Sequence, residues 1–260
     1  MSKRILVFTD SDGVLKEDKR PVVQDLIDVI AHARRARNII VVRITGAPAS
    51  HLLDGLTVDR AFAETGGVEL LHDGVIRVLP HAHYAADVLR RLKQALDITA
   101  DDGHVDTIHG AFGLEGVRYT TCTVFFGKHP LYPEHTTSAD YKKVADWIQG
   151  HILNLKLPLF MKSGATETYQ YFDIGHPNIM KKEIVVNMLL REIPHGRAYY
   201  LGDSGNDAGA MRCDLHPVTF SNGTQEIQQI VQERNGTLIG LPGPHGGSYE
   251  VFRRLINGSI

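Results

Sequence analysis

Residues 8–15 read Phe-Thr-Asp-Ser-Asp-Gly-Val-Leu, and they continue the apolar run of residues 5–8. A run of this kind is typical of a strand buried on both faces of a parallel sheet. Beyond the strand, in a loop turned by Gly13, Asp10 and Asp12 can converge on a ligand. Open α/β sheets bind ligands at the carboxyl ends of their strands. We therefore expect a site here, although an acidic turn is the alternative interpretation.

A second acidic cluster follows another apolar strand, in residues 199–207, Tyr-Tyr-Leu-Gly-Asp-Ser-Gly-Asn-Asp. Gly202 and Gly205 allow the backbone to approach a ligand closely. Asp203 and Asp207 bring two more carboxylates to the same sheet edge, where a cation would offset their repulsion. Hard oxygen ligands suit magnesium. A capped helix N-terminus explains one of these acids, but not their density together with the first motif.

Candidate phosphate ligands lie between the two acidic clusters. Thr45 and Gly46 follow the apolar run of residues 39–44, where a hydroxyl and the N–H groups of a turn can donate to phosphate oxygens. Lys181 and Lys182 begin a predicted helix, and lysine suits a phosphate as a point charge. Taken singly, a turn and a solvated helix face are the ordinary interpretations of these residues.

Strand and helix patterns alternate at both ends of the chain, which predicts a parallel sheet covered on both faces. We expect an α/β fold, a Rossmann-like doubly wound parallel sheet core formed by residues 1–79 and 176–260. Residues 80–175 carry α+β patterns and are predicted to form an inserted cap domain.

Within that insertion the patterns differ from the flanking parts. Residues 81–96 and 141–155 have helical spacing, and residues 117–126 and 168–174 have strand composition. Residues 97–116 are polar, contain glycine and show no clear period.

Composition narrows the range of partners. A composition of 43% hydrophobic and 22% charged residues is typical of a globular protein. The formal net charge of -2 gives no electrostatic reason to expect a nucleic-acid partner, which would favour a basic face. No apolar stretch is long enough for a membrane span, and the start lacks a secretory signal, so we expect a cytoplasmic monomer or homodimer. Two cysteines, Cys122 and Cys213, predict neither a disulfide nor a zinc site.

Four elements in this order resemble the motifs of the haloacid dehalogenase-like superfamily: Asp-Ser-Asp-Gly-Val-Leu, a strand-terminal Thr-Gly, a lysine opening a helix, and Gly-Asp-Ser-Gly-Asn-Asp. The insertion between the second and third is similar to the large-cap subclass, which includes Cof-type phosphatases, sucrose phosphatase and mannosyl-3-phosphoglycerate phosphatase. The resemblance implies a magnesium-dependent phosphatase acting on a small phosphorylated molecule.

The resemblance also implies roles for the four acids. Asp10 would be the nucleophile that forms an aspartyl-phosphate, and Asp12 the general acid and base. Asp10, the backbone carbonyl of Asp12 and Asp203 would hold Mg²⁺, and Asp207 would support the metal through water.

The same resemblance assigns the phosphate contacts. Thr45 and a lysine would stabilise charge on the transferring group, with Gly46 beside them and Asn206 orienting the phosphate or Asp207. Either Lys181 or Lys182 satisfies the helical spacing, and we favour Lys182.

One position departs from the family pattern and one region sets specificity. Ala47 stands where the subclass often has an arginine, which leaves substrate anchoring near that loop open. Five residues near the end of the insertion are candidate substrate contacts: Lys162, Ser163, Thr166, Glu167 and Thr168.

Several functions fit these residues. The first is hydrolysis of a sugar phosphate, a phosphorylated sugar acid or a phosphoglycolate-like metabolite, and a loose likeness of residues 243–250 to the sucrose phosphatase branch favours a sugar. The alternatives are a phosphomutase of the same superfamily and a catalytically inactive phosphate-binding protein. A receiver domain also uses Asp, Thr and Lys around magnesium, but it lacks an inserted cap.

Overall fold

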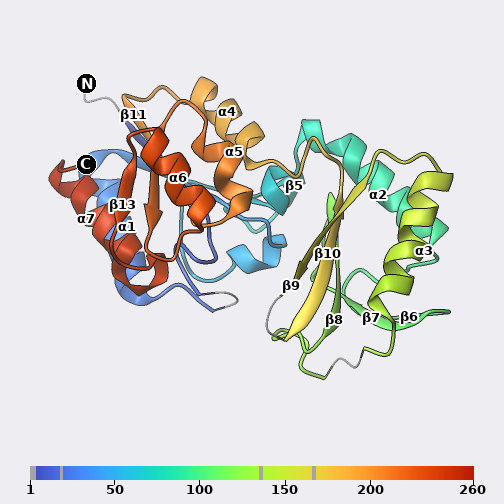
Figure 1. The fold of residues 1–260 in the computed structure, drawn as a ribbon. Helices are drawn as coiled ribbons and strands as arrows, with labels where there is room; N and C mark the ends of the chain where they lie inside the picture. Colours follow the sequence, from blue (N-terminus) through green and yellow to red (C-terminus); the bar gives the residue numbers. More distant parts are fainter. Residues whose placement is uncertain (1–3, 18–19, 135–136, 166–167) are drawn as a thin grey trace.

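The computed structural model describes residues 4–17, 20–134, 137–165 and 168–260, which form two units side by side (Figure 1). We call the part built on the larger sheet the core unit. The segment from α2 to β10 forms the second, inserted unit, because strands before and after it both belong to the larger sheet.

The larger sheet has eight strands in the order β13-β12-β11-β1-β2-β3-β4-β5. Pairing is parallel from β13 to β3, and β4 and β5 continue the sheet antiparallel. The strand bounds are β1 Ile5–Thr9, β2 Ile39–Ile44, β3 Arg60–Ala63, β4 Val68–Leu70, β5 Ile76–Val78, β11 Arg197–Leu201, β12 His216–Phe220 and β13 Thr237–Ile239.

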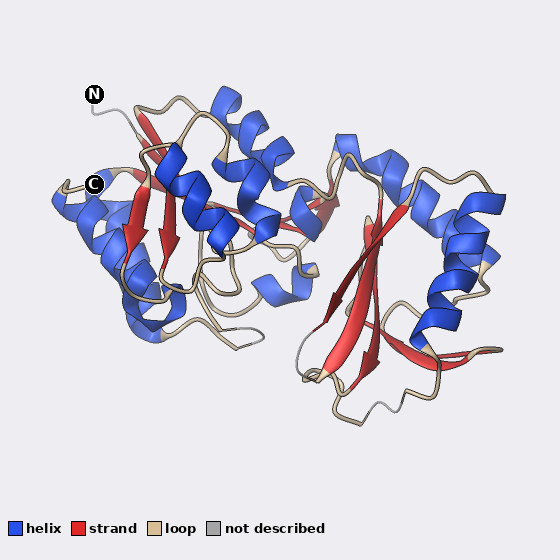
Figure 2. Ribbon diagram, viewed as in Figure 1, coloured by secondary structure: helices blue, strands red, loops and turns tan. Residues whose placement is uncertain are grey.

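Helices cover both faces of this sheet (Figure 2). In β1, Val7 packs with α1 and α7, whereas Leu6 and Phe8 pack with α4, α5 and α6. Successive side chains of a strand point to opposite faces, so a continuous apolar run fills two separate apolar clusters. The helix bounds are α1 Gln24–Arg37, α4 Lys182–Glu192, α5 Ala208–Met211, α6 Gln225–Glu233 and α7 Ser248–Asn257.

Strand order brings the motifs together. β1 lies between β11 and β2, and all three run parallel, with Thr9 beside Leu201 and Arg43 in the register. Their carboxyl ends therefore lie side by side, at the point where the strand order reverses direction from β1.

The inserted unit is an antiparallel sheet of five strands with α2 (His83–Ala95) and α3 (Tyr141–Asn154) on the side away from the core unit (Figure 2). The strand order is β6-β7-β8-β10-β9. The bounds are β6 Gly103–Thr107, β7 Gly110–Leu114, β8 Thr121–Gly127, β9 Phe160–Ala165 and β10 Tyr169–Gly175.

The observed fold confirms the predicted α/β class with a doubly wound sheet and an α+β insertion. The predicted boundaries of the insertion fall in the connection between β5 and α2 and directly after β10. Three strands, β6, β7 and β9, were not predicted. Among the described residues, no helix combines the length and the hydropathy that a bilayer crossing demands.

Candidate active site

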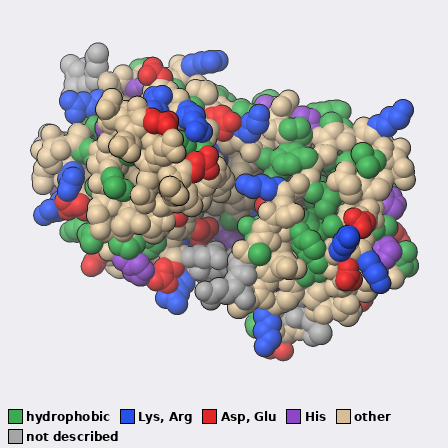
Figure 3. Space-filling view, in the orientation of Figure 1, with side chains coloured by type: hydrophobic (Ala, Val, Ile, Leu, Met, Phe, Trp, Pro, Cys, Tyr) green, Lys and Arg blue, Asp and Glu red, His purple; other side chains and the backbone are tan. Residues whose placement is uncertain are grey.

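A cavity of about 600 Å³ lies where the two units meet. The space-filling view is hollowed at this junction, and acidic and basic side chains lie at its edge (Figure 3). The core unit contributes the residues that follow its strands. These are Asp10, Asp12, Gly13, Thr45, Gly46, Ala47, Asp203, Ser204, Gly205 and Asn206.

Asp10 is held at both carboxylate oxygens. The Ser11 N–H donates to Oδ1 at 2.7 Å, and Lys182 Nζ lies 2.7 Å from Oδ2. Burial and the nearby Asp207 carboxylate raise the pKa of Asp10 to about 8, against the opposing effect of Lys182. A second cation is therefore needed to keep Asp10 ionised at neutral pH.

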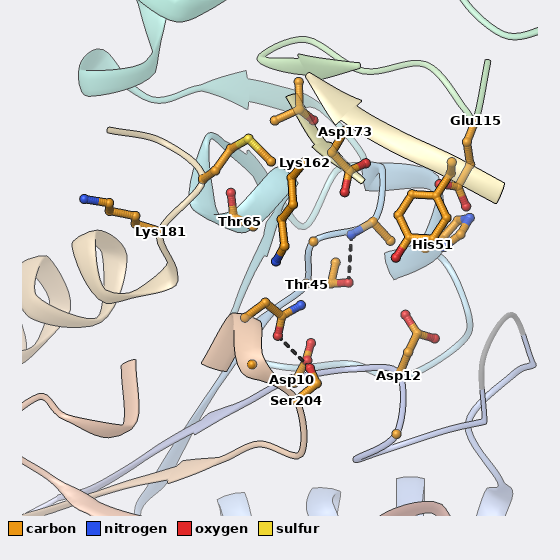
Figure 4. Close-up of a pocket in the computed structure, with 18 of the residues that line it drawn as sticks. Asp10, Asp12, Thr45, His51, Thr65, Glu115, Lys162, Asp173, Lys181 and Ser204 are labelled. Atoms are coloured by element: carbon orange, nitrogen blue, oxygen red, sulfur yellow. Dashed lines mark hydrogen bonds between the residues drawn. The ribbon is translucent and has the colours of Figure 1, made fainter. Parts of the chain in front are cut away.

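Lys182 lies between two carboxylates and has no exposed surface. Its Nζ is 2.7 Å from Asp10 Oδ2 and 2.8 Å from Asp207 Oδ1. Burial alone would lower the pKa of Lys182, but the two carboxylates raise it above its ordinary value. Lys181 is exposed at the cavity rim and points away from Asp10 (Figure 4). The structure thus brings Lys182, and not Lys181, to the predicted nucleophile.

Asp207 uses both oxygens within the protein. Oδ1 accepts from Lys182 and from the Tyr200 hydroxyl at 2.7 Å, and Oδ2 accepts from the N–H groups of Asp203 and Ser204 at 3.1 and 3.2 Å. These contacts hold Lys182 and the turn that carries Asp203. Asp207 therefore fits an indirect role at a metal, in line with the water-mediated role expected from the resemblance.

Asp203 provides the test of whether a cation fits. One oxygen each of Asp10, Asp203 and Asp207 lies within 4.8 Å of the others. Asp203 Oδ1 is buried and has no hydrogen-bond partner among the described residues, and burial followed by the Asp207 charge raises the pKa of Asp203 to about 7. Gly13, at φ +76°, passes so near that a Cβ would lie 1.9 Å from Asp203 Oδ2. A buried oxygen without a donor, in a cluster of carboxylates, fits a hard divalent cation such as Mg²⁺.

The loop after β2 faces the same space. Thr45 is buried, and its Oγ1 accepts from the Ala47 N–H at 3.1 Å, so its hydroxyl hydrogen can still donate into the cavity (Figure 4). A Cβ at Gly46 would lie 3.8 Å from Asn206 Nδ2, which places that amide beside the loop. Asn206 Oδ1 accepts from the Ser204 hydroxyl at 2.8 Å. These groups surround the expected phosphate position.

A buried ion pair supports the loop of Asp10 and Asp12. Arg43 is 1% exposed, makes two hydrogen bonds to Asp54 at 2.6 and 2.7 Å, and donates from Nε to Ser11 Oγ at 2.7 Å. Lys16 Nζ lies 3.3 Å from Asp54 and 3.9 Å from Asp12. A charged residue inside the apolar run of β2 is the one signal in the sequence that could have revealed this support.

We expect Asp54→Asn to lower the free energy of unfolding by about 3–5 kcal/mol, because it leaves the Arg43 guanidinium buried without its anion. Urea unfolding at pH 7 measures this. Asp59→Asn is the matched control, since Asp59 forms a two-bond ion pair with the half-exposed Arg34. That surface pair should contribute about 1 kcal/mol or less. Equal losses in both variants would contradict the supporting role of Asp54.

The inserted unit supplies the opposite wall. Lys162 and Ser163 of β9 line the cavity, and Lys162 points toward Thr45 (Figure 4). Of the other predicted contacts, Thr168 is not among the lining residues, and Thr166 and Glu167 lie outside the described residues.

Sequence reasoning missed several residues of the cavity wall. They include His51, Glu115, Arg118, Thr121, Phe160, Tyr169, Tyr171 and Asp173. Arg118 Nη1 donates to the Gly46 carbonyl at 2.9 Å, so an arginine from the inserted unit lies beside the loop that carries Ala47. No local motif marks these residues, and those of the inserted unit reach the cavity through contacts between parts of the chain that are far apart in sequence.

We expect the metal-free protein to lose stability as the pH rises. Asp10 and Asp203 have pKa values raised from 3.8 to about 8 and about 7, so folding favours their protonated forms. That contribution is complete below pH 4 and is lost as the pH rises to 8. In EDTA, the Tm should fall by about 5 °C or more between pH 5 and pH 8.5.

Magnesium at 10 mM should reverse this trend, with a larger rise in Tm at pH 8.5 than at pH 5, because the cation binds the ionised carboxylates. Asp203→Asn removes one of the two titrating groups, so the Tm of this variant in EDTA should depend less on pH. A Tm in EDTA that does not change with pH would contradict this account of the acidic cluster.

No protein-family model and no curated protein sequence matches the chain. Solved structures do match over nearly the whole chain. A phosphatase of the haloalkanoate enzyme superfamily from Bacteroides thetaiotaomicron is 16% identical, with 100% of this chain and 96% of that chain covered and a TM-score of 0.61. A haloacid dehalogenase-like hydrolase from the same organism is 14% identical, with 97% and 100% covered and a TM-score of 0.62.

The sucrose-phosphatase of Synechocystis, solved with sucrose and phosphate, is 15% identical, with 98% of each chain covered and a TM-score of 0.57. At these identities the likeness is one of fold. It agrees with the motif order, and the structure places the first, second and fourth motifs at the ends of β1, β2 and β11 and the third at the start of α4. The chain has the fold of the haloacid dehalogenase-like phosphatases.

Proposed function

We propose that this protein is a magnesium-dependent phosphatase that hydrolyses a small phosphomonoester through an aspartyl-phosphate on Asp10. The observation that carries the proposal is the meeting of Asp10, Lys182 and Asp203 at three neighbouring elements, with a buried Asp203 oxygen that has no donor among the described residues. A binding protein that has lost catalysis would not need both a nucleophile and the acid Asp12 at the same edge.

Four side chains take part directly in the proposed reaction, those of Asp10, Asp12, Lys182 and Thr45. An Asp10 oxygen attacks phosphorus while the bond to the leaving oxygen breaks, and Asp12 gives that oxygen a proton. Asp12 then takes a proton from water as the water attacks phosphorus, the acyl-phosphate bond breaks, and phosphate leaves. Lys182 and Thr45 stabilise negative charge on the transferring group.

A magnesium ion held by Asp10 and Asp203 would keep Asp10 ionised and offset its repulsion with the phosphate. Asp207 would act at a distance, through Lys182 and the turn of residues 203–207. The donor set described above supports these assignments.

The substrate is best explained as a phosphorylated sugar, with the sugar as the leaving group. A cavity of about 600 Å³ is much larger than phosphoglycolate needs and lies within the usual range of ligand pockets, roughly 300–1,000 Å³. The far wall combines the carboxylates Glu115 and Asp173 with the aromatic rings of Phe160, Tyr169 and Tyr171. Carboxylates accept from hydroxyl groups, and aromatic faces pack against the apolar face of a sugar ring.

The test is phosphate release from a panel with and without Mg²⁺. The panel contains glucose 6-phosphate, mannose 6-phosphate, sucrose 6-phosphate, trehalose 6-phosphate, a phosphorylated sugar acid, phosphoglycolate and p-nitrophenyl phosphate. We expect magnesium-dependent release with the highest kcat/KM for a neutral phosphorylated sugar. Preference for the sugar acid or phosphoglycolate would overturn the substrate class, and isomerised sugar phosphate without release would indicate a mutase.

A further inference from the structure

One segment of the inserted unit, residues 116–121, lies directly on two loops of the core unit. A Cβ at Gly67 would lie 2.3 Å from Thr120 Oγ1, and a Cβ at Gly116 would lie 2.6 Å from Pro48 Cγ. Neither position has space for a side chain as the units are now arranged. The two units are therefore in close contact at this point.

Glu64, from the core unit, is the centre of the contact and has no exposed surface. Its carboxylate accepts from the N–H groups of Tyr119 at 2.8 Å, Thr120 at 2.6 Å and Thr121 at 2.9 Å. The hydroxyl of Thr120 donates to it at 2.7 Å and that of Thr121 at 3.3 Å. Five donors from three consecutive residues converge on one side chain, and within the part of the chain that the structure describes no ammonium or guanidinium lies at hydrogen-bond distance from it.

The backbone at Glu64 and Thr65 adopts a left-handed conformation that residues other than glycine rarely adopt. Glu64 has φ 52° and Thr65 has φ 57°, both in the left-handed region. Such strain persists where surrounding contacts determine the conformation, and it clusters at functional sites. Thr65 Oγ1 also donates to the Ile179 carbonyl at 2.6 Å, so the same turn contacts the chain that returns from the inserted unit to α4.

The contact of Glu64 determines where Arg118 lies. Arg118 immediately precedes the three residues that Glu64 holds, its side chain is 7% exposed, and it pairs with Glu115 at 3.0 Å. It reaches the Gly46 carbonyl at 2.9 Å, one residue beyond Thr45. Thr121, which Glu64 holds directly, lines the cavity as well.

We propose that Glu64 is a positioning residue whose carboxylate fixes residues 119–121 on the core unit and thereby holds the substrate-facing wall of the inserted unit over Thr45. This inference rests on the proposed phosphatase function for its kinetic consequence. Among the described contacts, the Glu64 carboxylate meets no residue of the acidic cluster, so the loss of this carboxylate should affect recognition of the leaving group and leave the chemistry at Asp10 in place.

The test compares Glu64→Ala and Glu64→Gln with the control Glu69→Ala. Glu69 is also buried, at 4% exposure, and accepts from Arg60 at 2.6 Å and from Arg77, but these contacts all lie within the core unit. Two substrates are compared: p-nitrophenyl phosphate, whose good leaving group needs little recognition, and the phosphorylated sugar of the panel with the highest kcat/KM. Amide hydrogen exchange at residues 119–121 reports the contact without any substrate.

For Glu64→Ala we expect kcat/KM for the sugar phosphate to fall about 100-fold or more, mainly through KM, with turnover of p-nitrophenyl phosphate within about threefold of the unsubstituted protein. The amides of residues 119–121 should exchange faster. Glu64→Gln keeps the shape of the side chain and one accepting oxygen, so its kcat/KM for the sugar phosphate should lie between those of Glu64→Ala and the unsubstituted protein. This variant also shows whether the loss in Glu64→Ala comes from misfolding. Glu69→Ala should lower the Tm but change kcat/KM for the two substrates by similar factors.

Equal losses on both substrates in a folded Glu64 variant, or unchanged exchange at residues 119–121, would overturn the inference. The proposed function fails differently, because the unsubstituted protein would then hydrolyse neither substrate. In that case the exchange measurement still decides whether Glu64 holds the inserted unit.

Discussion

Asp10→Asn is expected to lower kcat for phosphate release by at least about 10⁴-fold, because the amide cannot form the acyl-phosphate bond. The substitution is nearly isosteric and keeps an oxygen for the Ser11 N–H, so the fold should persist. Asp28→Asn is a suitable control, since Asp28 is exposed on α1 and accepts only a local hydrogen bond from Gln24 at 2.9 Å among the contacts described. Phosphate release in saturating Mg²⁺ is the measurement.

Residual activity of Asp10→Asn within tenfold of the unsubstituted protein would exclude Asp10 as the nucleophile. Deamidation back to aspartate can imitate such a result, so the intact mass of the variant is checked after the assay.

Lys182→Met carries the second large expected effect. Methionine has a similar length but no charge, so Asp10 and Asp207 would lose the ammonium that lies 2.7 and 2.8 Å from them. We expect kcat to fall by about 10³-fold, the order found when one transition-state donor is removed. The free energy of unfolding should fall by about 3–5 kcal/mol at neutral pH, because the carboxyl groups of Asp10 and Asp207 would remain buried without the ammonium that pairs with them.

Lys181→Met is the matched control. Its side chain is exposed and the residue immediately precedes the same helix, so the variant should change KM modestly and leave stability within about 0.5 kcal/mol. Urea unfolding and steady-state kinetics on both variants show which of the two lysines contributes to stability and to kcat. A larger loss in Lys181→Met than in Lys182→Met would reverse the assignment.

The core unit was predictable because its strands are buried on both faces. Such strands are almost entirely apolar, as in residues 5–8 and, apart from Arg43, residues 39–44, and their carboxyl ends are followed by Asp10 and Thr45. Parallel pairing then places those ends side by side, with Gly202 and Asp203 after β11. Local composition and one topological rule were sufficient for this part of the site.

The inserted unit was less predictable because its edge strands lack such a pattern. β9 is exposed or half-exposed at every position, and β6 combines glycine, histidine and aspartate with a single buried valine, Val105. The hydrogen bonds of neighbouring strands hold such segments extended, whatever their own propensity. Their contribution to the cavity, Lys162 included, follows from that pairing.

Glu64 illustrates what sequence cannot reveal. In the string Ala-Glu-Thr-Gly-Gly it has the composition of an acidic turn, and its partners lie 55 to 57 residues further along the chain. The structural role of Glu64 depends on a contact between two units that are formed by separate parts of the chain. The same holds for Arg118 and the Gly46 carbonyl, 72 residues apart.

The most direct test of the account is to trap the intermediate on Asp10. In Asp12→Asn, p-nitrophenyl phosphate can still transfer its phosphate, since its leaving group needs no proton, but water lacks its general base. The enzyme is mixed with this substrate and Mg²⁺, quenched in acid and reduced with borohydride, which converts an aspartyl-phosphate to homoserine. We predict homoserine at position 10, dependent on both Mg²⁺ and substrate, as read by peptide mass spectrometry. Release of p-nitrophenol with aspartate intact at position 10 would contradict the account.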